Sequence, residues 1–145
     1  MGLDLLGPFL CSRHGIPHLI DAGGGSIVNV SSVAALKGNF AGHIYSAAKG
    51  GVISLTRSLA GRYWRNNIRA NAIAPGLILT GRIQERVGVD PSLPIDDQIE
   101  AATTEQLRRY PFAVGPPGDI APSPCSWRPT SPAWSTAPSS RPTAA

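Results

Sequence analysis

Two short apolar runs rich in β-branched residues, separated by one long helical pattern, constrain the fold most. Residues 26–31 and 68–74 predict short strands, and the first is apolar enough to be buried in a parallel sheet. Between them, residues 43–66 carry apolar side chains at helical spacing and a C-terminal end rich in arginine, which suits the helix dipole. A strand, a long helix and a second strand form a right-handed crossover unit. The expected fold class is therefore α/β with a parallel sheet.

The flanking segments predict further helices and turns. Residues 2–20 read as an apolar helix interrupted at Pro8 and Pro17, and residues 33–42 read as a loop. Residues 81–110 predict two short helices on either side of Pro91 and Pro94. The glycine cluster at 23–25 precedes a strand rather than following one, so it predicts a turn and not a phosphate-binding loop.

Net charge and cysteine content argue against several other classes of protein. The 145-residue chain suits one domain at most and has a net charge of +4. Its arginines at 57–69 fit the outer face and end of the predicted helix, so we expect no nucleic-acid partner. Two cysteines, Cys11 and Cys125, do not make a disulfide framework and fit a reducing cytosol. We therefore expect a cytoplasmic protein.

Neither a metal site nor a membrane span is expected from the sequence. The spacing of Cys11, His14 and His18 invites a zinc reading, but Pro17 interrupts the face and no fourth ligand follows at a recognisable spacing. No run approaches the ~18 apolar residues that a bilayer-spanning helix needs, and no signal sequence is recognisable.

Ser32, Tyr45 and Lys49 form a pattern that suits proton transfer. Lys49 lies one helical turn after Tyr45, on the same predicted face. A phenol is a poor base at neutral pH, and a nearby ammonium favours its phenolate form. A serine hydroxyl at the end of a strand can hydrogen-bond a substrate oxygen, so the three groups can move a proton on or off a carbinol. A solvated helical face is the alternative for the tyrosine and lysine alone.

At these residues the chain resembles the short-chain dehydrogenase/reductase family. The resemblance covers about residues 2–121, with low similarity near 84–105. It is carried by DLLGPFLCSRHGIPHLI, GSIVNVSS, YSAAKGGVISLTRSLA, IRANAIAPGLILTG and PFAVGPPGDIA. The resemblance implies a doubly wound Rossmann-type sheet, an NAD or NADP cofactor, a small alcohol or ketone substrate and a homo-oligomer.

The resemblance also implies roles for particular residues. Ser32 would orient the substrate carbonyl, Tyr45 would be the acid/base, and Lys49 would hold the nicotinamide ribose and tune the tyrosine. Ser31 is excluded because it lies one residue too far from Tyr45 and successive strand residues face opposite sides. The cofactor-binding positions implied are Tyr45, Lys49, Pro75, Gly76 and Thr80.

Two departures from the family pattern concern the N-terminal part of the chain. The Gly-rich loop that holds the dinucleotide pyrophosphate is not found, so we expect residues 1–121 to be the C-terminal portion of a Rossmann domain. Asp4 stands where the family usually has an asparagine. Its carboxylate either forms an ion pair that holds Lys49 or caps the first helical turn, and the sequence leaves both open.

Residues 122–145 form a segment of different composition. They hold six of the fourteen prolines and no acidic residue, which predicts a disordered tail. One back-translation, read from the last base of each codon, gives AVALFLASDESGVVNGAVIPADGG, which is similar to the end of the family's fold. We therefore expect a frameshift or a wrongly assigned reading frame after Ala121.

Three functions follow from these observations as alternatives. The first is an NAD(P)-dependent oxidoreductase that transfers a hydride between nicotinamide and a secondary alcohol or ketone. The second is an inactive fragment that lacks the pyrophosphate site. The third is an assembly module that uses its two long helices to bind intact relatives.

The DNA sequence of the locus tests the expectations about both ends of the domain. We expect an in-frame Gly-rich strand–turn–helix upstream and a one-base slip after codon 121. A reading frame that continues without discontinuity through codon 121 would contradict the frameshift.

Overall fold

A computed structural model describes residues 1–38, 41–107 and 114–120 of the chain. The predicted tail at 122–145 lies outside these residues. The described chain forms two compact units, the first spanning Met1–Ala74 and the second beginning at Pro75.

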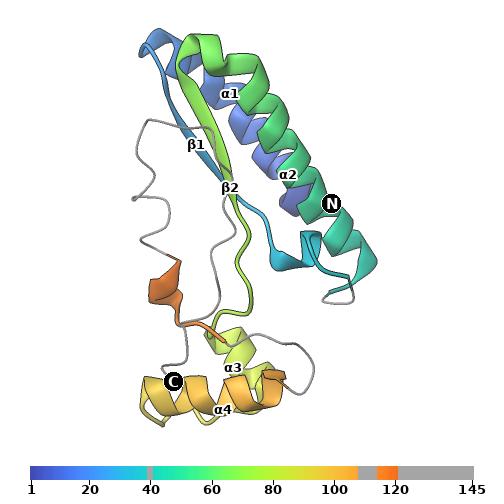
Figure 1. Ribbon diagram of the computed structural model, residues 1–145, viewed down its shortest axis with the longest axis vertical. Coiled ribbons are helices and arrows are strands. Elements are labelled where there is room, and N and C mark those ends of the chain that lie inside the picture. The colour runs from blue at the N-terminus through green and yellow to red at the C-terminus, as the bar shows by residue number, and fades with distance from the viewer. Residues whose placement is uncertain (39–40, 108–113, 121–145) are drawn as a thin grey trace, which may run out of the picture. The chain divides into compact units, whose positions relative to one another are not determined.

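The first unit is a helix–strand–helix–strand arrangement around a two-stranded parallel sheet. Strands β1 (Gly25–Val30) and β2 (Ile68–Ile73) pair in parallel, from Gly25 opposite Ile68 to Val30 opposite Ile73. Helices α1 (Gly7–Asp21) and α2 (His43–Tyr63) lie side by side along the strands (Figure 1). This arrangement confirms the predicted α/β class.

Apolar side chains from both helices and β2 form the core of the first unit. Ile16 of α1, Leu59 of α2 and Ile68 of β2 are buried together. Full burial of a large aliphatic side chain contributes about 2 kcal/mol. The helical spacing within α2 therefore serves mainly to hold its inner face against the sheet.

The glycine cluster at 23–25 is a turn, as the sequence predicts. The amides of Gly23 and Gly24 donate to the carbonyls of Ile20 and Leu19, at 2.9 and 2.8 Å. The Gly25 amide donates to the carbonyl of Asn67 at 3.0 Å. All three N–H groups are thus used to end α1 and to align the starts of the two strands, which leaves none of them for a phosphate.

The prediction that prolines interrupt the first helix is wrong for Pro17. Helix α1 continues through Pro17, while Pro8 lies in its first turn, where an amide needs no intrahelical acceptor. A proline inside a helix removes one backbone hydrogen bond. The burial of neighbouring Ile16 in the core offsets this loss, so tertiary packing overrides the local signal.

The other predicted boundaries differ from the structure by a few residues. The long helix, predicted to end at residue 66, ends at Tyr63. The last three predicted residues form a 3-10 turn, η3 (Trp64–Asn66), before Asn67, which has a left-handed backbone. Strand β1 begins and ends one residue earlier than predicted, and β2 ends one residue earlier. Asparagine tolerates the left-handed conformation, which explains why the helix stops there.

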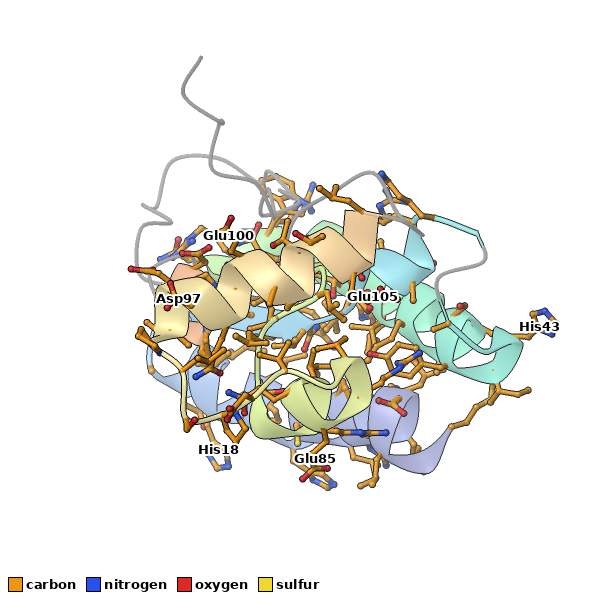
Figure 2. All side chains as sticks on the ribbon, turned by 90° about the horizontal axis from the view of Figure 1, so that it is seen from below. His18, His43, Glu85, Asp97, Glu100 and Glu105 are labelled. Atoms are coloured by element: carbon orange, nitrogen blue, oxygen red, sulfur yellow. The ribbon has the colours of Figure 1, made fainter. Side chains whose placement is uncertain are left out.

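The second unit contains the two predicted short helices, α3 (Gly81–Val87) and α4 (Ile95–Leu107). Leu79, Ala102 and Val114 form its buried core. The acidic residues Asp97 and Glu100 lie along the outer side of α4 (Figure 2). Residues 108–110, which the sequence analysis assigned to the second helix, fall outside the described residues.

Replacing Gly24 should destabilise the first unit at its strand starts. Gly24 has φ +137° and an added Cβ would lie 2.6 Å from the Asn67 carbonyl oxygen. We expect Gly24→Ala to lower the free energy of unfolding by about 3 kcal/mol in urea denaturation. Gly61→Ala is the control, because Gly61 is helical with no atom within 4 Å of an added Cβ. It should be neutral or slightly stabilising, and equal losses for the two variants would contradict the backbone argument.

Candidate active site

Two serines, Ser31 and Ser32, follow the carboxyl end of β1, beside the end of β2. The Ser31 amide donates to the Ile73 carbonyl at 2.7 Å, which extends the sheet by one hydrogen bond beyond β1. Ser32 then leaves the strand direction as the N-cap of the 3-10 turn η2 (Val33–Ala35). Its Oγ accepts a hydrogen bond from the Ala34 amide at 3.2 Å. This bond uses a lone pair, so the hydroxyl proton of Ser32 can still be donated.

The Lys49 side chain runs from α2 back to the end of β1. Its Nζ donates to the Val30 carbonyl at 3.1 Å and lies 3.4 Å from Oδ1 of Asp4. The Lys49 side chain is 13% exposed, against 41% for Asp4. The turn that carries Asp4 has no side-chain cap. Of the two readings that the sequence left open for Asp4, the structure therefore supports the ion pair.

Tyr45 and Lys49 lie on one side of α2, close enough for their side chains to interact. The Lys49 Nζ is 5.7 Å from the centroid of the Tyr45 ring, within the range of a cation–π contact. Tyr45 is 39% exposed, so part of the residue is open to solvent. The helix thus presents a phenol and an ammonium as a pair at the carboxyl end of β1.

Ser31 fixes the backbone of the helical turn that carries Lys49, a role that the sequence did not predict. It is 3% exposed, and its Oγ donates to the Lys49 backbone carbonyl at 2.7 Å. The bond joins the end of β1 to the turn of α2 that carries the lysine. The sequence signal for this role of Ser31 is the pair of consecutive serines at the end of the strand. Ser31 bonds to α2, and Ser32 enters the turn η2.

A hollow of about 340 Å³ lies between η2 and the first turn of α2. Ala34, Lys37, His43 and Ser46 are among its lining residues. His43, at the start of α2, projects outward (Figure 2). The hollow borders the segments that follow Ser32 and carry Tyr45.

The remaining predicted site residues belong to the second unit. Thr80 is the exposed N-cap of α3, and Pro75 and Gly76 are partly buried in the segment before it. The Leu79 amide, next to Thr80, donates to Gly115 at 2.8 Å, which fixes the backbone there. The cofactor roles of Pro75, Gly76 and Thr80 stay predictions.

The described residues contain neither a cluster of three metal ligands nor a helix that could span a membrane. No group of three His, Cys, Asp or Glu side chains gathers to hold a metal ion within residues 1–38, 41–107 and 114–120. Among the helices of these same segments, none combines the length and apolar character needed to cross a bilayer.

Comparison with known proteins identifies the family. The family model for short chain dehydrogenases matches residues 1–88. The chain therefore belongs to the short-chain dehydrogenase family, as its motifs predict.

Individual relatives agree with this assignment. A Bradyrhizobium diazoefficiens protein named as a probable short-chain type dehydrogenase/reductase is 39% identical over 123 residues, which are 83% of this chain and 40% of the relative. The inactive 2-(S)-hydroxypropyl-CoM dehydrogenase 2 of Xanthobacter autotrophicus is 37% identical over 83% of this chain and 50% of its own length.

A solved structure shows the same fold. The gluconate 5-dehydrogenase of Burkholderia cenocepacia, in complex with NADP and tartrate, matches with a TM-score of 0.63 and 26% identity. The match covers 80% of this chain and 42% of that protein. The chain thus spans between 40% and 50% of the length of these three proteins.

Removing the Ser31 hydroxyl should loosen the joint between β1 and α2. We expect Ser31→Ala to lower the free energy of unfolding by about 1 kcal/mol, because a buried hydrogen bond is lost. Ser58→Ala is the matched control, since Ser58 is exposed on the same helix, and it should change stability by less than about 0.5 kcal/mol. Urea denaturation of both variants measures the difference, and no excess loss for Ser31→Ala would contradict the joint.

Proposed function

We propose that this chain carries the proton-transfer centre of an NAD(P)-dependent oxidoreductase acting on a secondary alcohol or ketone. The observation that carries the proposal is the position of the Lys49 ammonium. It is held at the Val30 carbonyl beside Asp4 and lies 5.7 Å from the Tyr45 ring. The geometry thus places a phenol and a charged hydrogen-bond donor side by side, and these are the groups that proton transfer to or from a carbinol would use.

Tyr45 is the acid/base in this proposal. In the oxidation direction its phenolate oxygen takes the proton of the substrate hydroxyl, and in the reduction direction its hydroxyl gives a proton to the carbonyl oxygen. Ser32 donates its hydroxyl proton to the same substrate oxygen and so orients it. The nicotinamide, when bound, accepts or supplies the hydride at the carbinol carbon.

Lys49 fits a role in holding the cofactor. An ammonium has three N–H donors. One is directed to the Val30 carbonyl and one faces Asp4, which leaves a third for a hydroxyl of the nicotinamide ribose. We further propose that Pro75, Gly76 and Thr80 contact the nicotinamide side of the cofactor. The choice between NAD and NADP stays open, although the Burkholderia cenocepacia relative binds NADP.

An inactive protein is the alternative, and a relative favours keeping it. The Xanthobacter autotrophicus protein that is 37% identical to this chain is named as inactive. Family membership alone therefore does not establish turnover. The chain spans 40% of the Bradyrhizobium relative and 50% of the Xanthobacter one, so turnover and substrate are to be measured on this chain itself.

A kinetic comparison of tyrosine variants tests the proposal. Reduced-nicotinamide absorbance is followed with NADH and NADPH and a panel of ketones. We expect turnover by the unaltered chain and a loss of at least about a hundredfold for Tyr45→Phe, because the transferable proton is removed.

Tyr63→Phe is the matched control, since Tyr63 ends the same helix and packs on the core. It should retain activity. An unaltered chain that shows no saturable binding of either dinucleotide at millimolar concentration would contradict the proposal and support the inactive alternative.

A further inference from the structure

We propose that His14 and His18 form a binding site for a divalent transition-metal ion on the exposed side of α1, and that the bound ion stabilises the helical turn between them. The two histidines belong to α1, whereas Tyr45 and Lys49 belong to α2. The inference therefore goes beyond the proposed function, and it is tested without turnover.

The spacing of the two histidines places both imidazoles on one side of the helix. They enclose the sequence HGIPH, four residues apart. Side chains at this spacing are neighbours, with Cβ atoms about 6 Å apart, and two histidines four residues apart on one helix are a known zinc-binding pattern. The sequence argument against a metal, that Pro17 interrupts the face, fails because α1 continues through Pro17 to Asp21.

Burial on the opposite side of α1 fixes the backbone that carries the two imidazoles. Ser12 and Ile16 are buried, whereas His14 and His18 are exposed. The Ala22 amide donates to the His18 carbonyl at 3.0 Å, so His18 still belongs to the hydrogen-bonded part of the helix. A metal ion therefore finds both ligands on a helix that is already formed, and binding requires little ordering of the chain.

The chemistry of the pair favours nickel, copper or zinc over magnesium or calcium. Neutral imidazole is a common ligand of the first three ions, whereas the last two prefer oxygen. Within the described residues, no third His, Cys, Asp or Glu completes a site with the pair. Water fills the other coordination positions, so we expect an exchangeable ion. His18 lies in the last turn of α1, where the helix dipole attracts a cation.

The turn between the two histidines needs support more than the rest of the helix. It contains Gly15 and Pro17, the residue types of lowest helix propensity. Pro17 also lacks the amide proton for a backbone hydrogen bond. An ion coordinated by both imidazoles links the two ends of this turn. Because the ion binds the helical form of the turn, it should raise the stability of the folded chain.

Nickel(II) binding to the folded, metal-free chain tests the site. The chain has three histidines, His14, His18 and His43, which allows a comparison within one molecule. Titration calorimetry with nickel chloride should show saturable binding by the unaltered chain. We expect binding at least about tenfold weaker for His14→Ala and for His18→Ala, because a chelate then loses one of its two ligands. Magnesium chloride should give no binding.

Three control variants separate the pair from other ligands. His43→Ala removes an exposed histidine from the start of α2 and should bind nickel as the unaltered chain does. Arg13→His/His14→Arg keeps the composition, but it places the two histidines of α1 five residues apart and on different sides of the helix, so it should bind as weakly as His14→Ala. Cys11→Ser should leave the affinity unchanged.

Urea denaturation with and without nickel tests the effect on the turn. We expect nickel to raise the midpoint of the unaltered chain and EDTA to reverse the rise. The midpoints of His14→Ala and His18→Ala should not respond to nickel. Both variants should still unfold cooperatively in the absence of metal, since alanine favours a helix at an exposed position.

Equal nickel affinity for the unaltered chain and the two alanine variants would overturn the proposal. A weakened Cys11→Ser would overturn the two-histidine site, because the thiol would then be a ligand. Binding that depends on both histidines but leaves the urea midpoint unchanged would overturn the stabilising role, because the unfolded chain would then bind equally well.

Discussion

The hydrogen bond from Lys49 Nζ to the Val30 carbonyl is the interaction on which the candidate site depends. It is made at 3.1 Å between a helix side chain and the last residue of β1. A backbone acceptor cannot be changed by substitution of its own side chain, so the lysine is tied to the fold itself. Tyr45, one turn earlier on α2, is then placed relative to the strand end through the same helix. The positions of Tyr45 and Lys49 are thus set by the sheet rather than by a loop.

Two further hydrogen bonds join the β1 segment to α2, and a third lies within α2. Ser31 joins the strand end to the backbone of the lysine turn at 2.7 Å. Deeper in the same interface, the Asn29 amide donates to Thr56 Oγ1 at 2.9 Å, and Thr56 donates to the Val52 carbonyl at 2.7 Å. Buried polar groups are costly unless paired, so these bonds also favour one packing of α2 on β1 over others. The site sits at the end of a strand–helix interface that is apolar near Leu59 and polar toward Lys49.

The sequence predicted the elements of the fold better than the contacts between them. The strand–helix–strand order followed from apolar spacing, and the family from the motif around Ser32, Tyr45 and Lys49. Continuation of α1 through Pro17 did not follow, because the burial of Ile16 is a property of the packed unit. The role of Ser31 was missed for a related reason, since its partner is a backbone carbonyl eighteen residues away. For Asp4 the sequence left open an ion pair with Lys49 or a helix cap, and only the position of its turn, η1 (Gly2–Leu6), against α2 decided between them.

The turn at 23–25 has a consequence for the chemistry at the opposite end of the strands. Successive side chains on a strand point to opposite faces, so a slip of one residue between β1 and β2 would put one of the two serines in the place of the other and a valine, Val30 or Val33, in the place left behind. The hydrogen bond from Gly25 to Asn67, about 20 Å away at the strand rise of β1, helps to set the register. The turn therefore helps to decide which serine hydroxyl bonds the Lys49 carbonyl and which one caps η2.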